Sequence, residues 1–364
     1  MKDTGADHMG TKLGDIVDAT AISLTDLSGK KLAIDAFNTI YAFLSSIRQP
    51  DGTPLLDRQG RVTSHLSGLF YRNINLLENG INPVYVFDGE APKLKAREQQ
   101  KRREIREAAY EEWKIAKSEG RIEDALKAAK GSSRLTTPMI EESKGLLTAL
   151  GIPVIQAPSE GEALAAQMAR EGLVWASASQ DNDSLLYNCP RMIRNLSLSG
   201  RRRGGRSKTY KMISPELIDL DQNLRLLGVS REQLIDVAIL IGTDYNDSVT
   251  GVGPKTALKL IKKHGSLEKV ESAFKTSSKP KDKEKYVELQ EIPYDEIREI
   301  FLNPPQTEIK APEWSDPQSD ELHKILCTEH DFSESRVQKS LERLTSALEE
   351  LRGSTHQSSL SDFF

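Results

Sequence analysis

Residues 82–89 read NPVYVFDG, a short run of mainly apolar residues that ends in an acid and a glycine. Three other segments have a similar strand-like character: KKLAID at 30–35, GIPVIQAPSE at 151–160 and LVWASASQDND at 173–183. The segments between them have helical patterns, and we expect helices over 36–48, 64–79, 138–150 and 160–171. Strands that alternate with helices predict an α/β fold with a mainly parallel central sheet covered by helices on both faces.

Length and composition limit the class of protein. The chain has 364 residues, of which 29% are charged and 37% are hydrophobic, so it can bury a large core beneath an ionic surface. It has no apolar stretch long enough to cross a membrane and no pattern of a secretory signal, so we expect neither membrane insertion nor secretion. The two cysteines, Cys189 and Cys327, can form neither a disulfide framework nor a thiolate-rich zinc site. The net charge of −4 averages over patches and does not exclude a nucleic-acid ligand.

Several segments interrupt the α/β pattern. Residues 93–134 are charged and helix-permissive, which predicts an exposed helical insertion. The segment SGRRRGGRSKTYK (199–211) is basic and contains no acid, which predicts a surface loop. Towards the C-terminus we expect the following elements: helices over 214–275 that are interrupted by GVGPK (251–255), a solvated linker at 277–285, two helices over 319–352, and a polar tail over 353–364.

Seven acidic residues follow the apolar runs closely: Asp35, Asp88, Glu160, Glu162, Asp181, Asp183 and Asp244. Ligands of parallel α/β sheets bind beyond the carboxyl ends of the strands, so we expect these side chains at one rim of the sheet. Two like charges ~4 Å apart repel by about 4 kcal/mol at an effective dielectric of 20, so the cluster requires raised pKa values or bound cations. Oxygen-only ligands suit Mg²⁺ or Mn²⁺, and two such ions ~3.5–4 Å apart commonly hydrolyse phosphodiesters.

Each of these acids also has a simpler interpretation. Aspartate is common in turns at strand ends, and Ser159 with Glu162 fits a capping box at the start of the helix from 160. Asp183 could stabilise its own loop. The joint pattern favours metal binding over these local roles.

The motifs VFDG before a basic helix, APSEGEA, QDND, GTDYN and GVGPKTA resemble, in order and spacing, those of the flap endonucleases. The resemblance covers the chain from Met9 onwards and implies a nuclease domain over 9–352 with a mixed, mainly parallel sheet flanked by helices. It further implies a helical arch at about 90–135 and a helix-hairpin-helix at about 234–264. The implied activity is structure-specific hydrolysis of 5′ DNA flaps at the junction with duplex, with 5′-exonuclease activity, in lagging-strand maturation and repair.

The resemblance also implies roles for single residues. It divides the acids into two metal sets: Asp35, Asp88, Glu160 and Glu162 in the first, and Asp181, Asp183 and Asp244 in the second. Two Mg²⁺ ions, which Mn²⁺ can replace, would bridge the scissile phosphate. Lys95 and Arg102 match a basic pair at the foot of the arch, where they add positive charge to the transition state. Tyr41 matches an aromatic residue that stacks on a base beside the scissile phosphate.

The segment GVGPKTALKLIKK is the candidate contact to duplex DNA. Gly251 and Gly253 allow a tight hairpin whose backbone N–H groups can approach a phosphate, and Lys255 and Lys259 add positive charge. Alone, this motif fits an ordinary helix turn equally well, but the resemblance implies that it grips duplex backbone together with K⁺. Weaker matches assign further DNA contacts: Arg48 and Arg72 on helices, and Arg201, Arg202 and Arg203 in the basic loop. For this loop, a solubilising role is the alternative.

The tail QSSLSDFF matches the short box by which replication proteins dock on the sliding clamp (PCNA). Gln357 would fill a polar pocket, while Leu360, Phe363 and Phe364 would form an apolar plug on one helical turn. The alternative is that the two phenylalanines fold back onto the body of the protein.

The two ends of the chain depart from the commonest family pattern. Residues 1–8 precede Met9, which matches the family's start, and we interpret them as an extension or a remnant of cloning. No basic tail follows the clamp box, which makes the chain resemble archaeal members. That origin would make the protein cytoplasmic and nucleoid-associated, whereas a eukaryotic one would be nuclear.

Two other functions remain open. One is a repair nuclease of the same superfamily that prefers bubbles or Holliday junctions, and the short insertion and the early clamp box disfavour it. The other is a non-catalytic junction-binding accessory, which the seven intact acids disfavour because without metal they would repel DNA. We expect a monomer whose partners are branched DNA with a 5′ flap and the sliding clamp, with no membrane partner.

Overall fold

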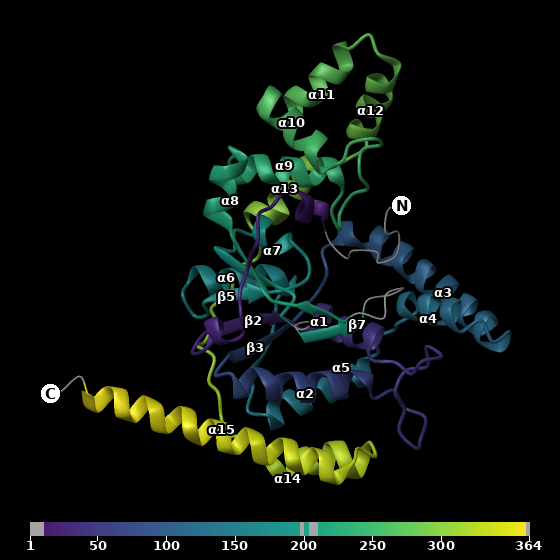
Figure 1. Ribbon diagram of the computed structural model, residues 1–364. Helices are drawn as coiled ribbons and strands as arrows, with labels where there is room; N and C mark the ends of the chain where they lie inside the picture. Colours follow the sequence, from purple (N-terminus) through teal and green to yellow (C-terminus); the bar gives the residue numbers. More distant parts are fainter. Residues whose placement is uncertain (1–10, 197–199, 204–209, 362–364) are drawn as a thin grey trace. The chain divides into compact units, whose positions relative to one another are not determined.

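The computed structural model describes residues 11–196, 200–203 and 210–361, with side chains except at 200–203, 210–212 and 354–361. The chain divides into two compact units, whose helices and strands are drawn in Figure 1. The first contains the described residues up to Ala21, together with Asp88–Arg102 and Gln156–Ile309. The second contains Ile22–Phe87, Arg103–Ile155 and the described residues from Lys310 onwards.

The first unit contains four strands of a mixed sheet. In spatial order they are β1 (Thr20–Ala21), β9 (Glu216–Asp219), β6 (Arg191–Arg194) and β5 (Ala176–Ala178). The strands β5 and β6 are parallel, with Ser177 opposite Met192, whereas β9 is antiparallel to both of its neighbours. All three residues of β5 are buried, as expected for a short strand covered on both faces.

Helices make up most of the rest of the first unit. They are α6 (Gly161–Arg170), α7 (Asp183–Leu186), α8 (Leu220–Leu227), α9 (Arg231–Ile241), α10 (Pro254–His264), α11 (Leu267–Thr276), α12 (Pro280–Gln290) and α13 (Tyr294–Leu302). A capping box formed by Ser230 and Gln233 starts α9. Every residue of α9 from Leu234 to Ile241 is buried, because this stretch is apolar except for Asp236, which pairs with Arg298 at 2.7 Å.

The second unit contains the strands β2 (Lys31–Asp35), β3 (Asn82–Phe87) and β4 (Val154–Gln156), with β3 in the middle. The strands β2 and β3 are parallel, with Asp35 opposite Val86. Their near-continuous burial reflects sequences without polar alternation.

Helices α1 (Ala36–Ser46) and α2 (Ser64–Glu78) pack closely in the second unit. A Cβ added at Gly68 of α2 would lie 2.2 Å from the ring of Phe43 on α1, so this contact requires glycine. The other helices of this unit are α4 (Ile122–Gly131), α5 (Thr137–Ala149), α14 (Ser319–His323), a π-helical turn (Lys324–Glu329) and α15 (Glu334–Ser361). Helix α3 (Ala96–Ser118) begins in the first unit and ends in the second.

The predicted α/β fold with a mixed sheet flanked by helices is confirmed. The four predicted helices correspond to α1, α2, α5 and α6, and the charged insertion is helical in α3 and α4. No helix in the described part of the chain is long and apolar enough to cross a membrane.

Three expectations about local structure were wrong. The described residues of the basic segment form the strands β7 (Gly200–Arg203) and β8 (Tyr210–Ile213), which pair as an antiparallel hairpin. The segment expected to be helical from 214 begins with β9, because its residues pair with β6 and β1. The expected linker at 277–285 forms most of α12, in which Pro280 takes a position at the helix start that needs no N–H donor.

Candidate active site

Six of the seven predicted acids lie in the first unit, after strands or at helix starts. Their positions are Asp88 after β3, Glu160 and Glu162 at the start of α6, Asp181 and Asp183 around the start of α7, and Asp244 after α9. The seventh, Asp35, lies in the second unit, where it is the N-cap residue of α1 and accepts a hydrogen bond from the Asn38 N–H at 3.0 Å. Strand ends and helix starts thus position six of the seven acids, whereas Asp244 lies in the turn that follows α9.

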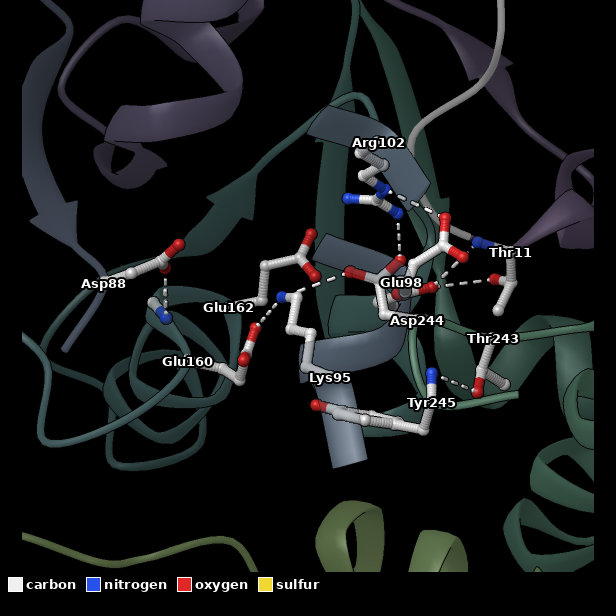
Figure 2. Close-up of polar contacts among 12 residues, drawn as sticks. Thr11, Asp88, Lys95, Glu98, Arg102, Glu160, Glu162, Thr243, Asp244 and Tyr245 are labelled. Carbon is white, nitrogen blue, oxygen red and sulfur yellow. Dashed lines mark hydrogen bonds and ion pairs between the residues drawn. The ribbon is translucent and has the colours of Figure 1, made fainter. Parts of the chain in front are cut away.

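Lys95 lies between two of the acids (Figure 2). Its ammonium group forms a hydrogen-bonded ion pair with Glu160, and its Nζ lies 3.1 Å from Oδ2 of Asp244. Arg102 forms an ion pair with the other oxygen of Asp244, and its Nε donates to Glu98 at 3.1 Å. The basic pair predicted from the sequence therefore contacts the predicted acids directly.

Burial and the two cations shift the pKa values of three of the acids in different directions. Burial raises the pKa of Asp88, and it does so although Lys95 and the Gly161 N–H, which donates to Asp88 at 2.7 Å, act in the opposite direction. Burial likewise raises the pKa of Glu160 despite its contact with Lys95. The pKa of Asp244 is instead lowered, because Lys95 and Arg102 together outweigh its burial.

The carboxyl group of Asp183 also has a raised pKa. Burial, together with the charge of Asp244, raises its pKa to about 6. Thr11 opposes this shift, because its N–H and its hydroxyl both donate to Oδ1 of Asp183, at 3.1 and 2.8 Å. This carboxyl group therefore lies where negative charge accumulates.

Replacing Asp183 with asparagine is expected to stabilise the metal-free protein most strongly above pH 6. Because the folded-state pKa is about 6 instead of 3.8, the folded protein binds more protons than the unfolded chain over this interval, so stability falls as pH rises. At about 1.36 kcal/mol per pKa unit, the variant should gain up to about 3 kcal/mol at pH 8 and less at pH 5. Urea unfolding in chelator at both pH values measures this difference, and an equal effect at both would contradict it.

Sequence analysis missed three residues that support the site. Ser179 donates its hydroxyl to Oε1 of Glu162 at 2.9 Å and accepts the Asp181 N–H at 3.1 Å, so it links two predicted acids. The hydroxyls of Tyr187 and Tyr245 are 2.9 Å apart, and both rings pack on Phe301 beneath Lys95 and Glu160. Ser179 lies two residues before Asp181, so its proximity to the acidic motif was the available signal.

The acids have the oxygen donors that a hard divalent cation requires, and burial raises the pKa values of Asp88, Glu160 and Asp183. However, no group of three or more His, Cys, Asp or Glu side chains in the described part of the chain is arranged to hold a metal ion. Lys95 and Arg102 form ion pairs with Glu160 and Asp244 instead. The carboxylate oxygens thus suit a metal ion, provided that Lys95 and Arg102 move away from Glu160 and Asp244.

Tyr41 and Arg48 lie in the second unit. The Arg106 guanidinium lies over the Tyr41 ring, 5.3 Å from its centroid, and donates to its hydroxyl at 3.1 Å. Arg48 donates to Leu44 O, Gly52 O and the Ser133 hydroxyl at 2.9, 2.8 and 2.9 Å. Because the Arg48 guanidinium donates these bonds to protein acceptors, they argue against a direct contact between Arg48 and DNA.

Arg72 is the other helical arginine assigned to DNA from the sequence. It lies on α2 in the second unit, and burial lowers its pKa to about 10. A partly buried guanidinium offers little surface to a phosphate.

The predicted hairpin joins α9 and α10. Gly251 has a φ of +73°, which favours glycine, whereas Gly253 has an ordinary φ of −91° and is the N-cap residue of α10. A Cβ added at Gly253 would meet no described atom within 4 Å. A cavity of about 340 Å³ lies here, lined by Asp15, Gly253, Pro254, Lys255 and Thr256.

Several predicted contact residues lie partly or wholly outside the described residues. The backbone of Arg201, Arg202 and Arg203 forms β7, but their side chains are outside the described set. The backbone of Gln357 and Leu360 continues α15, so the segment is helical for longer than the single turn expected, and their side chains are also outside it. Phe363 and Phe364 lie outside the described residues altogether.

The fold and this acidic centre define a structure-specific nuclease of the XPG class. The family model "XPG N-terminal domain" matches residues 9–109, and the model "XPG I-region" matches residues 151–244. The chain belongs to the flap endonuclease family. It is 50% identical over 351 residues to flap endonuclease 1 of Pyrococcus furiosus, covering 96% of this chain and 99% of that protein. Flap endonuclease 1 of Pyrobaculum aerophilum is 52% identical over 360 residues, covering 97% and 99%.

Solved structures agree with this assignment. The flap endonuclease-1 of Methanococcus jannaschii superposes with a TM-score of 0.66 at 40% identity, covering 94% of this chain and 99% of that one. The catalytic core of Rad2, solved in complex with its DNA substrate, superposes with a TM-score of 0.66 at 27% identity, covering 91% and 97%. The chain is thus an enzyme, a nuclease of the hydrolase class, and its fold is consistent with the use of a divalent metal.

Proposed function

We propose that this protein is a metal-dependent endonuclease that cleaves a 5′ DNA flap at its junction with duplex and also acts as a 5′-exonuclease. The observation that carries the proposal is the pairing of Lys95 and Arg102 with Glu160 and Asp244 at buried acids. Cations next to a surplus of carboxylates suit a site that must admit both metal and phosphate. Lagging-strand maturation and repair on nucleoid DNA are the processes that produce such flaps.

Two Mg²⁺ ions, or Mn²⁺, would be held by the two sets of acids and would supply Lewis-acid activation of the phosphate and of a water. The protein's own contribution is to place charge. Lys95 and Arg102 leave their carboxylates and approach the phosphate as negative charge develops on it, which is worth about 10²–10³ in rate per donor. Asp88 and Asp183, whose pKa values are raised by burial, would add oxygen donors for these cations.

Tyr41 would stack on the base next to the scissile phosphate. Its ring already binds the cation of Arg106 from α3, which supports a surface that accepts a flat, polarisable partner. The target nucleotides must unpair to reach the acids, at a cost of about a few kcal/mol. Helices α3 and α4 would form the arch that admits a single strand and excludes duplex.

The hairpin between α9 and α10 would hold the duplex backbone. Neither packing nor strain inside the described chain requires glycine at Gly253, so close approach of an outside group is the better reason for it. The N–H groups at the start of α10 and the charge of Lys255 and Lys259 favour a phosphate there. A K⁺ ion would complete this contact, and Arg201, Arg202 and Arg203 would bind the duplex as well.

The C-terminal box would bind the sliding clamp (PCNA). Gln357, Leu360, Phe363 and Phe364 provide the polar and apolar groups for this contact. Clamp capture by the full chain but not by a chain shortened at 353 tests this interaction. Equal capture by both would contradict it.

The test of the nuclease function is cleavage of a 5′-labelled flap with Mg²⁺ and with chelator, beside plain duplex and single strand. We expect metal-dependent release of the flap as one short product, with duplex largely spared. Degradation of all three substrates would contradict junction selectivity. Binding without any product, also after removal of residues 1–8, would support the junction-binding accessory instead.

A further inference from the structure

Thr11 is bound to an acid far along the chain. It is 3% exposed, and both its N–H and its hydroxyl donate to the same oxygen, Oδ1, of Asp183, which is 5% exposed (Figure 2). The distances are 3.1 and 2.8 Å, and 172 residues separate the two. Two converging donors restrict the rotation of a carboxylate more than one does, because they define both its direction and its plane.

A local role does not explain the contact. Thr11 occupies the N-cap position of the short helix Lys12–Asp15, where a threonine hydroxyl ordinarily caps the helix. Here its side chain makes no capping bond. The hydroxyl is therefore directed at Asp183 instead of its own helix.

The surroundings of Asp183 explain why its carboxylate needs these hydrogen bonds. Asp183 experiences the negative charge of Asp244, and repulsion between two buried carboxylates would turn them apart. Donors on Oδ1 oppose that rotation, and Thr11 leaves Oδ2 to other partners. A pocket whose acids must keep their orientation needs such support.

We propose that Thr11 is a positioning residue that holds the Asp183 carboxylate in place for cation binding and for cleavage. Only the part of this inference that concerns cleavage rests on the proposed function, because the part that concerns cation binding needs no DNA. Because both bonds of Thr11 end on Asp183, its effect on a bound cation passes through that carboxylate.

The test uses Thr11→Val, which keeps the shape of the side chain and the backbone N–H but removes the hydroxyl. Loss of a hydrogen bond to a charged group should weaken Mn²⁺ binding to the DNA-free protein about tenfold in titration calorimetry. The kcat on a flap substrate should fall by about the same factor while KM changes little. Thr11→Ser, which restores the hydroxyl, should return both values to within about twofold.

Thr276→Val is the matched control, since Thr276 is exposed and its hydroxyl binds its own helix at Ser272 O. It should leave Mn²⁺ affinity and kcat unchanged. Unchanged Mn²⁺ affinity in Thr11→Val, or failure of Thr11→Ser to restore it, would overturn the proposal.

A double variant keeps the test decisive if Thr11→Val folds poorly. In an Asp183→Asn background, Thr11→Val should cause no further loss of Mn²⁺ affinity, because the group that Thr11 positions is already changed. An equal, additive loss in both backgrounds would show that Thr11 acts elsewhere and overturn the inference. Because Mn²⁺ binding needs no flap, failure of the inference and failure of the proposed nuclease function give different results.

Discussion

Replacing Asp244 with asparagine is expected to slow flap cleavage by about a thousandfold or more. Its carboxylate contacts both Lys95 and Arg102, and its pKa is lowered because these two cations outweigh burial. The neutral amide would lose both ion pairs and one proposed cation ligand. Loss of about 4 kcal/mol of electrostatic stabilisation corresponds to this factor in rate.

Single-turnover cleavage of a labelled flap in Mg²⁺ measures this effect. DNA affinity in chelator should stay the same or improve, because the variant removes a negative charge near the phosphate. Asp247→Asn is the matched control, since this nearby acid is 60% exposed and pairs with Lys101. A loss smaller than tenfold in Asp244→Asn, or an equal loss in both variants, would remove Asp244 from the catalytic centre.

Replacing Asp57 with alanine is expected to destabilise the fold by about 3–5 kcal/mol, because the Gln59 and Arg61 N–H groups and the buried His330 ring lose a charged hydrogen-bond acceptor. The Asp57 side chain is fully buried and pairs with Arg61 Nε at 2.7 Å. It also accepts the N–H groups of Gln59 and Arg61 at 3.0 and 2.8 Å. His330 Nδ1 lies 3.2 Å away, so one carboxylate joins the 57–61 turn to the segment before α15.

Urea unfolding followed by circular dichroism measures the change in unfolding free energy. Arg58→Ala provides the comparison on the same turn. Its side chain is 89% exposed and lies 3.5 Å from Asp331, so its removal should cost less than about 1 kcal/mol. Similar losses in both variants would show that Asp57 is not the main attachment of this turn.

Local sequence patterns predicted much of the fold. The apolar runs ending in Asp35 and Asp88 and the helical spacing of α1, α2, α5 and α6 are visible within short windows, because burial of one face repeats every few residues. Residues 277–285 were expected to be a linker because they are polar, and α12 was therefore not predicted. Its buried Leu289 lies beyond that window, and packing against neighbouring helices stabilises such a helix more than its own propensity does.

The sequence by itself identified the candidate acids, because most of them follow a strand-like apolar run or begin a helix. It also determined the family, through motifs whose residues lie close together in the chain. Only the tertiary structure decided what these groups touch. It brought Thr11 to Asp183, paired Lys95 and Arg102 with Asp244, and engaged Arg48 in bonds within the protein. Such partners lie up to 172 residues apart, and no local periodicity records which distant donor a buried carboxylate will meet.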